Sequence, residues 1–357
     1  MASPCLAEQQ SIRVINVDAA AIHVDGRLDD AAWTTATAVT LTQQSPHAGA
    51  PSPYVTTMRV VADRRNVYFA FTCTDPDPGR IAIHTMQRDG DMYGDDSVAI
   101  VFDTFGDQRS GYYFRVNAGG ARDDGLISNP DDIPLDWDGV WDARVARSAT
   151  GWTAEIMIPV NTIRFDPNLR SWGFNAERYV PRERQTLRWS GPTLDARFAD
   201  FRRAGALDVP AFHQGVGLTV NLNTLARRTS DFVSGDRALA GRTGVDVGYN
   251  VTPQLGAVAT VNTDFAETEV DTRQINLTQF PLFFPEKRAF FLEGSNQFNF
   301  ALNLGEDFVP FYSRRIGLVE GNIIPLNTGL KILGRAGKWG IAALDVATGQ
   351  ALSLIHI

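Results

Sequence analysis

Through residues 14–207, apolar and polar residues alternate in short runs that end at turn-forming sequences. One run occupies 67–73 and stops at DPDPG (75–79), and similar runs occupy 98–102 and 152–158. Alternation with a period of two is typical of β-strands that bury one face. Because helical periodicity is nearly absent from this stretch, it is predicted to form an antiparallel β-sandwich.

From Val209 onward the alternation continues, but the polar positions change in character. The stretch 209–226 has no Asp, Glu, Lys or Arg, and the apolar residues of 216–222 alternate with Gly, Thr and Asn. Residues 245–251 and 255–261 repeat this pattern around a turn. A water-exposed face would carry Lys and Glu, whereas small and amide side chains suit the interior of a membrane β-barrel, whose strands need about 9–11 residues. This part of the chain is therefore predicted to begin such a barrel.

An aromatic segment at 280–312 holds nine of the 21 Phe residues of the chain. So many exposed rings would favour aggregation, and the segment is therefore expected to be buried. Its charged residues allow two interpretations. They form either a salt-bridged packing anchor, among Glu286, Arg288 and Glu293, or a plug inside a barrel.

The charge balance argues against one large class of partners. Of the 357 residues, 33 are Lys or Arg and 41 are Asp or Glu, which gives a net charge of −8. A nucleic-acid-binding protein needs a basic surface to displace counterions from phosphates, so no nucleic-acid partner is expected. The two cysteines are too few for a disulfide scaffold. No run of 18 or more apolar residues occurs, so no transmembrane helix is predicted.

The ends of the chain depart from both patterns. Residues 1–11 are interpreted either as a disordered start or as the remnant of an export signal, and after export Cys5 could form a disulfide with Cys73. The sequence ALSLIHI at 351–357 is interpreted as a non-native tail. The remaining predicted domains are a carbohydrate-binding β-sandwich at 12–207 and the N-terminal part of a barrel at 208–350.

Catalytic motifs are missing from the sequence. The five histidines are scattered, and there is no H-E-x-x-H, G-x-S-x-G, Walker or C-x-x-C motif. A glycosidase needs two carboxylates about 5–9.5 Å apart across a cleft, and no motif selects such a pair here. We therefore predict no catalytic residue, and if the chain is an enzyme, a glycoside hydrolase is expected.

An acidic turn at 88–97 is a candidate structural calcium site. Oxygen-rich turns bind Ca²⁺, but the closing Glu of an EF-hand loop is replaced by Ile100. A solvated acidic turn remains the alternative interpretation. The candidate ligands are Asp89, Asp91, Asp95 and Asp96.

Six segments of the first domain, taken in order, resemble family 9 carbohydrate-binding modules. They are IHVDGRLDDAAWTTA (22–36), NVYFAFTCTDPD (66–77), GDDSVAIVFDT (94–104), YYFRVNAGG (112–120), GWTAEIMIPVNTIRF (151–165) and WGFNAER (172–178). The resemblance implies an antiparallel β-sandwich that binds a glycan or polysaccharide. It also implies structural calcium, which family 9 modules carry.

The later segment NTDFAETEVDTRQINLTQFPLFFPEKRAFFLEG (262–294) is similar to a bacterial outer-membrane family known as domain of unknown function 5916. In such proteins a module at the front precedes a C-terminal β-barrel. The resemblance implies a partial, truncated barrel in contact with outer-membrane lipid. It places the chain in the bacterial cell envelope, with the sandwich in the periplasm or at the surface.

The family resemblance also indicates sugar-binding residues. An aromatic ring can stack on the apolar face of a sugar, and polar side chains bond its hydroxyls. Tyr93 stands where the family has an aromatic wall, and Phe198 is the nearest candidate for a second wall. Arg115 and Asn117 match polar contacts of the family, whereas the expected acid is replaced by Ala99.

Trp137 and Trp141, in DWDGVWDA (136–143), are an alternative aromatic platform or else core residues.

The expected function is glycan binding that serves carbohydrate uptake or catabolism. Two alternatives stay open: a hydrolase of O-glycosyl bonds or its accessory domain, and a structural barrel with a periplasmic or surface cap.

Overall fold

The computed structural model divides into two compact units, Met1–Gly215 and Val216–Ile357, each with its own sheets and core. It describes residues 10–18, 21–128, 130, 133–135, 137–213, 217–230, 237–262, 286, 288–292, 298, 311–316, 318–319, 322–324, 326–336 and 339–349. Within these ranges, no helix is both long and apolar enough to span a membrane.

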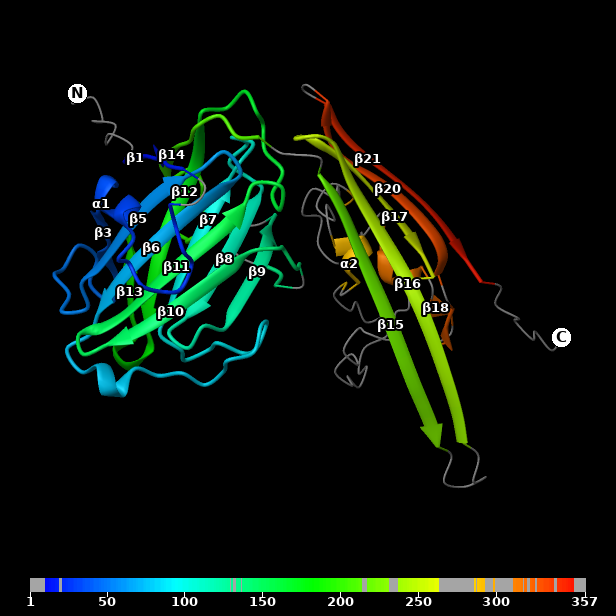
Figure 1. Cartoon of the computed structure of the whole chain (residues 1–357), viewed down its shortest axis with the longest axis horizontal. Coiled ribbons are helices and arrows are strands. Elements are labelled where there is room, and N and C mark those ends of the chain that lie inside the picture. Colours follow the sequence, from blue (N-terminus) through cyan, green and yellow to red (C-terminus); the bar gives the residue numbers. More distant parts are fainter. Residues whose placement is uncertain are drawn as a thin grey trace. The chain divides into compact units, whose positions relative to one another are not determined.

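The first unit contains an eight-stranded sheet, called here the first sheet (Figure 1). Its main path runs β1 (Ser11–Arg13), β14 (Gly205–Asp208), β12 (Ser171–Val180), β7 (Ser97–Asp103), β8 (Gly111–Asn117) and β9 (Arg122–Ile127). Off this path, β13 (Gln185–Arg188) pairs with both β12 and β4 (Thr42–Ser45). Pairing is antiparallel except between β1 and β14, which run parallel.

A six-stranded second sheet faces the first across the core. It runs β10 (Asp142–Ser148), β11 (Gly151–Pro159), β6 (Asn66–Thr74), β5 (Thr56–Ala62) and β2 (Ile15–Asn16), with β3 (Val39–Thr40) also on β5. The short helices α1 (Ala31–Thr35), η1 (Pro78–Arg80) and η2 (Pro181–Glu183) lie in the connections. The prediction of an all-β, sandwich-like fold is confirmed.

Aromatic side chains fill the space between the two sheets. Phe69 on β6 stacks on Phe174 of β12, with ring centroids 5.6 Å apart, and lies 5.5 Å from Phe102 of β7. All three rings are fully buried. Alternate residues of these strands point into the core, as the period of two in the sequence predicts. The alternate residues of β7 and β12 form the outer face of the first sheet.

Helix α1 covers the outer side of the second sheet through Trp33. Its indole Nε1 donates to Glu155 Oε1 at 2.8 Å, and the other carboxylate oxygen accepts from the backbone N–H groups of Asp25 and Gly26. Burial raises the pKa of Glu155, although these three bonds favour its charged form. Glu155 is therefore a structural residue, and Trp33 is a core residue.

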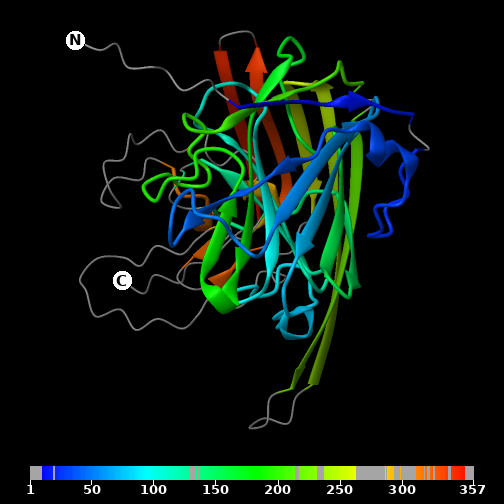
Figure 2. The same cartoon turned by 90° about the vertical axis from the view of Figure 1, so that its left-hand side faces the viewer.

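In the second unit, the described long strands form a five-stranded antiparallel sheet in the order β15 (Leu218–Ser230), β16 (Arg237–Thr252), β17 (Leu255–Val261), β20 (Leu326–Ala336) and β21 (Trp339–Thr348). The hairpin of β15 and β16 extends well beyond the rest of this sheet (Figure 2). Shorter elements are α2 (Ala289–Leu292), η4 (Ser313–Arg315), β18 (Leu318–Val319) and β19 (Asn322–Ile323).

The two faces of the five-stranded sheet differ in what covers them. Lys331 is 1% exposed and donates its Nζ to the carbonyl oxygen of Phe290 in α2, which lies against this face. On the opposite face, one cross-strand row places Val220, Val247 and Leu330 in register through β17, and their exposed fractions are 60%, 37% and 47%. The row ends at the exposed Asp345 of β21, which pairs with Leu330. This opposite face is therefore largely apolar, with one charged edge position, and uncovered by the described residues.

The aromatic segment of the second unit is described in part. Arg288 binds Glu286 through Nη2 and Oε2 at 2.6 Å and lies 4.2 Å from the ring centroid of Phe291. The Glu286–Arg288 pairing of the packing-anchor interpretation is thereby confirmed. Glu293 and most of 280–312 lie outside the described residues, as does Cys5. Cys73 is buried, and burial raises its pKa to about 12.

Candidate functional site

A row of charged side chains crosses the outer face of the first sheet. Strand register places Arg188 beside Glu177, Glu177 beside Ala99, Ala99 beside Arg115, and Arg115 beside Asp123. These residues alternate with the core-facing residues of β12, β7 and β8, so the row faces away from the second sheet. The row is alternately positive and negative except at Ala99, its one uncharged position.

A cavity of about 160 Å³ opens around this uncharged position. Because the side chain of Ala99 ends at Cβ, it does not fill the space between the flanking side chains of Glu177 and Arg115. Its walls come from three adjacent strands, β7, β8 and β12. The lining residues are Ser97, Ala99, Tyr113, Arg115, Glu177 and Tyr179.

Arg115 is fixed by the next strand. Its Nε donates to both carboxylate oxygens of Asp123 at 3.0 Å, and its Nη2 also binds Oδ2. Burial lowers the pKa of Arg115, but Tyr113, Asp123 and Asp91 together hold that pKa above its usual value. Arg115 is therefore permanently charged, and its Nη1 has no protein acceptor among the described residues.

Glu177 is held from the opposite side of the cavity. Arg188 donates to its Oε2 from Nη2 at 2.6 Å and from Nε at 2.9 Å. The side chain of Glu177 is 20% exposed. Since both bonds use Oε2, Oε1 has no donor within the part of the chain that the structure describes. The cavity thus has one charged donor and one charged acceptor available on its two sides.

Aromatic rings border the same row. Tyr113 lines the cavity. The ring of Phe198 contacts the ring of Tyr113 edge to face, with ring centroids 6.3 Å apart. Phe198 also lies 5.6 Å below the guanidinium of Arg188. Of the predicted aromatic walls, the structure therefore brings Phe198 to the edge of the row that carries Arg115.

Tyr93 lies on the loop between β6 and β7 and is 87% exposed. Its backbone N–H donates to Asp91 at 2.8 Å, which forms a local turn. It does not line the cavity in this structure, although Asp91 of the same turn is close enough to affect the pKa of Arg115. Tyr93 is an exposed aromatic side chain on the turn that contains Asp91.

Asn117 was expected to contact sugar, but its side chain is fully buried and engaged. Its Nδ2 donates to the Thr85 carbonyl and to Asp95, and its Oδ1 accepts from the N–H groups of Gly119 and Ala121. All the hydrogen-bonding capacity of the amide is thereby used. Asn117 is a loop-fixing residue.

The alternative platform of Trp137 and Trp141 also lies elsewhere. Trp141 is 4% exposed, packs edge to face on Phe114, and donates its Nε1 to Asp124 at 2.9 Å. Trp137 is partly buried against the same core, 5.3 Å from Tyr112. Both rings contact the core rather than the charged row, so the core interpretation holds for them.

The four predicted calcium ligands do not converge. Asp96 is buried and binds Arg178 through two contacts of 2.9 Å, whereas Asp95 accepts from His84 and Asn117. Asp91 accepts from a backbone N–H in its own turn. Asp95 and Asp96 are thus held by different partners.

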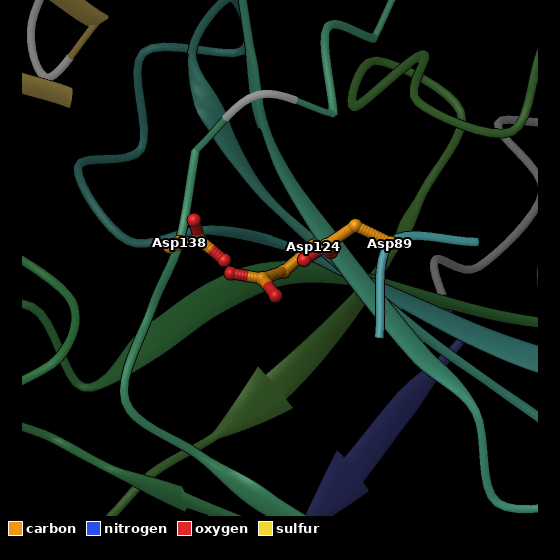
Figure 3. Close-up of side chains that lie close together, drawn as sticks. All are labelled: Asp89, Asp124 and Asp138. Atoms are coloured by element: carbon orange, nitrogen blue, oxygen red, sulfur yellow. The ribbon is translucent and has the colours of Figure 1, made fainter. Parts of the chain in front are cut away.

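Asp89 instead meets two aspartates from distant segments, Asp124 and Asp138 (Figure 3). One oxygen of each lies within 4.8 Å of the others. Arg88 already binds this group, at 2.8 Å from Asp124 and 3.1 Å from Asp138. Asp124 also accepts from the Gly139 N–H and the Trp141 indole. Protein donors therefore already occupy several oxygens of this group.

Comparison with known proteins identifies the family of the first unit. Residues 24–207 match the family described as "Carbohydrate family 9 binding domain-like", which is more than half of the chain. The chain belongs to this family. Within the carbohydrate family 9 binding domain-like fold, the charged row lies on the outer face of the first sheet. Residues 224–328 match a domain of unknown function, DUF5916.

Solved structures that match the chain include a family 9 carbohydrate-binding module from Caldicellulosiruptor kristjanssonii in complex with cellotriose. It is 15% identical, covers 57% of this chain and 95% of its own, and has a TM-score of 0.42. A putative carbohydrate-binding protein from Bacteroides uniformis is 13% identical over 57% of this chain and all of its own, with a TM-score of 0.45. No curated protein matches the chain.

Sequence reasoning missed Glu177 and Tyr113 as site residues. Glu177 lies within the recognised segment WGFNAER (172–178), and its alternation with core residues places it on the outer face. Its position beside Ala99 depends on the pairing of β12 with β7. That pairing joins strands about 75 residues apart, and spacing along a single sequence does not specify it.

Proposed function

We propose that the cavity beside Ala99 binds carbohydrate. A sugar hydroxyl both donates and accepts hydrogen bonds, and it therefore suits a site with a free Arg115 Nη1 and a free Glu177 Oε1. The ring of Tyr113 at the cavity wall provides an apolar surface for the C–H face of a pyranose. Membership of the carbohydrate family 9 binding domain-like family supports the same ligand class.

The observation that carries this proposal is the pairing of one charged donor and one charged acceptor across a single uncharged position. Each hydrogen bond to a charged group contributes about 1.5–3 kcal/mol, and an aromatic contact adds about 0.5–1.5 kcal/mol. These contributions correspond to micromolar to millimolar dissociation constants. A reversible capture site is the expected result.

A glycan array probed with the full chain tests the proposal. Arg115→Ala should remove binding, because it deletes the only charged donor that lines the cavity in the described structure. Arg109→Ala is the matched control, since Arg109 is exposed in the turn between β7 and β8. Absence of signal across plant and bacterial glycans, or equal signals from both variants, would contradict the proposal.

Hydrolysis is less compatible with this geometry. Glu177 is the single carboxylate among the residues that line the cavity, whereas glycosidases use two across the bond that breaks. We therefore favour binding over hydrolysis. Assays for reducing-sugar release should give no activity above buffer for any glycan that the array identifies.

We further propose that the second unit contacts outer-membrane lipid, so that the binding unit is held at the bacterial cell envelope for glycan uptake. The exposed face of the five-stranded sheet supports this, because Leu222, Val251 and Trp339 are 69%, 53% and 70% exposed. Exposed apolar patches of this kind mark membrane or protein interaction sites. Flotation with phosphatidylethanolamine–phosphatidylglycerol vesicles should recover the chain with lipid, and Leu222→Asp with Val251→Asp should weaken that recovery.

A further inference from the structure

A second pocket in the first unit lies where its first and last strands end. It encloses about 560 Å³ and is lined by residues 13–16, 170–171 and 208–210. These segments are the crossing from β1 to β2, the start of β12 and the end of β14. The crossing carries the chain from the first sheet to the second, and the pocket is called here the corner pocket. It shares no lining residue with the cavity beside Ala99.

Two arginines in the wall of the corner pocket have no acidic partner. Arg13 is exposed on β1, and its side chain has no acceptor among the described residues. Arg170 donates from Nη1 to the carbonyl oxygens of Pro167 and Leu169, at 2.9 and 3.5 Å. Its Nε and Nη2 have no acceptor within the described part of the chain. Guanidinium groups bind phosphate and carboxylate oxygens through such N–H donors.

One carboxylate lines the same pocket. Asp208 stands opposite Arg13 in the parallel pairing of β1 and β14, and it forms no ion pair with the residues that the structure describes. Asp208, Arg13 and Arg170 together carry one net positive charge. A carboxylate accepts hydrogen bonds but does not donate them, so an anion beside it is favoured when that anion brings a proton to donate.

We propose that the corner pocket binds a phosphomonoester in its singly protonated form. The unprotonated phosphate oxygens accept from Arg13 and Arg170, and the P–OH group donates to Asp208. The single negative charge of this form matches the net positive charge of the three side chains. A sulfate ester or a phosphodiester carries the same charge but has no such proton, so the pocket discriminates against both.

The apolar part of the lining indicates that an organic group carries the phosphate. Val14 and Val209 are 7% and 6% exposed, and Ile15 and Pro210 are half-buried. The volume of about 560 Å³ falls in the range of about 300–1,000 Å³ that small-molecule pockets enclose, and a phosphate group alone would leave most of it empty. A sugar phosphate and a lipid phosphatidate share the required chemistry.

Calorimetric titration of the full chain with methyl phosphate tests the site. Octyl tetraoxyethylene micelles supply a headgroup with neither charge nor sugar, and at about pH 5.5 a phosphomonoester keeps one proton, since its second pKa is about 6. Methyl phosphate should bind with a millimolar or lower dissociation constant, and methyl sulfate at least about tenfold more weakly. Equal binding of the two by the native chain would overturn the proposal.

Removal of the donors tests the arginines. Arg13→Ala should weaken the binding of methyl phosphate by about tenfold to a hundredfold, and it removes no side-chain contact within the described residues. Arg109→Ala, which changes an exposed arginine outside the pocket, is the matched control. Unchanged affinity in Arg13→Ala, with a normal thermal midpoint, contradicts the assigned role.

Replacement of the acceptor tests the proton contact. The amide in Asp208→Asn keeps the size of the side chain but adds N–H donors, so this variant should bind methyl sulfate and methyl phosphate with affinities within about threefold of each other. Thermal melting shows whether the fold is retained. A preference for phosphate that persists in Asp208→Asn rules out the contact between P–OH and Asp208.

Two larger probes distinguish the sources of the phosphate. Tighter binding of glucose 6-phosphate than of methyl phosphate indicates a sugar phosphate, whereas tighter binding of dihexanoyl phosphatidate indicates a lipid. Arg170→Ala should weaken whichever binds, and if neither exceeds methyl phosphate, the organic carrier is refuted. This site does not depend on the proposed carbohydrate binding: methyl phosphate binding with a silent glycan array supports it alone, and glycan binding without methyl phosphate binding overturns it alone.

Discussion

Ala99 determines how much room the site has. Its side chain is 7% exposed and stands between two charged residues, Glu177 and Arg115. Any larger residue on β7 at this level projects into the cavity. The size of one side chain therefore decides whether the row contains a cavity.

Ala99→Leu should remove carbohydrate binding while changing the free energy of unfolding by less than about 1 kcal/mol, because the added atoms enter the cavity rather than the core. Ala99→Ser adds a single oxygen and should retain measurable binding. Calorimetric titration and thermal melting of both variants provide the test. Full affinity in Ala99→Leu would show that sugar binds elsewhere.

Protonation of Asp89 should affect stability. Burial and the neighbouring Asp138 raise its pKa to about 6, which Arg88 opposes. The folded state therefore binds more protons than the unfolded state between about pH 4 and pH 6, and the contribution of Asp89 to stability falls as pH rises through this window. Its side chain is 38% exposed, so the effect is reduced by solvent.

Asp89→Asn should accordingly raise the thermal midpoint at pH 7 and have little effect at pH 4, as measured by circular dichroism. Asp91→Asn, in the same loop, is the control. Millimolar Ca²⁺ or EDTA should leave the midpoint at pH 7 unchanged, because Arg88 binds this group of carboxylates. Stabilisation by Ca²⁺ that Asp89→Asn abolishes would instead show a metal site.

At the scale of single residues, sequence reasoning named part of the candidate site. Arg115 and Phe198 were predicted, and the structure places both along the charged row. Asn117 and Trp141 were also predicted, but their polar atoms serve the loops that cover the core. A sequence shows that a polar residue is present; whether a neighbouring loop uses its hydrogen bonds depends on contacts between distant segments.

At the scale of elements, the turn between β10 and β11 has little room for a side chain. Gly151 has φ +142°, and a Cβ there would lie 2.0 Å from the carbonyl oxygen of Cys73 on the neighbouring strand β6. Positive φ favours glycine, and a contact with backbone cannot be relieved by side-chain rotation. The approach of β6 to β11 therefore depends on this glycine.

Gly151→Ala should lower the free energy of unfolding by about 2 kcal/mol or more, because it combines an unfavourable φ with a backbone clash. Gly79→Ala is the matched control, since a Cβ at Gly79 would meet its nearest atom at 3.7 Å. Urea unfolding followed by tryptophan fluorescence measures both. Similar losses in the two variants would contradict the role assigned to the turn.

Strands were the most predictable elements of this chain. The alternation at 67–73 and 152–158 corresponds to β6 and β11, because one face of each packs in the core. Strand β7 is buried along its whole length, since loop residues such as Phe201 cover its outer side. Phe201 follows β7 by about 100 residues in the chain. The local alternation of apolar and polar residues therefore does not predict that the outer side of β7 is covered.

At the scale of the whole molecule, the chain comprises two units with separate cores. Residues 10–213 include both sheets of the first unit and every residue that lines the cavity. The predicted boundary after residue 207 lies close to the division at Gly215. The first unit therefore has the components of an independently folding domain.

A fragment of residues 1–213 should unfold in one cooperative transition and bind the same sugar with an affinity within about threefold of the full chain. Thermal melting and calorimetry of the fragment, compared with the full chain, provide the measurement. A fragment that fails to bind, despite a cooperative transition, would show that the second unit contributes to the site.

The parallel pairing of β1 with β14 joins the beginning of the first unit to its end, with Ser11 opposite Ala206. During synthesis on the ribosome, β1 emerges first and has no partner until nearly two hundred further residues have been translated. Closing so long a loop is slow, so completion of the domain follows release of its last strand. A nascent chain stalled before β14 should therefore be accessible to chaperones and proteases, whereas one extended past it should be resistant.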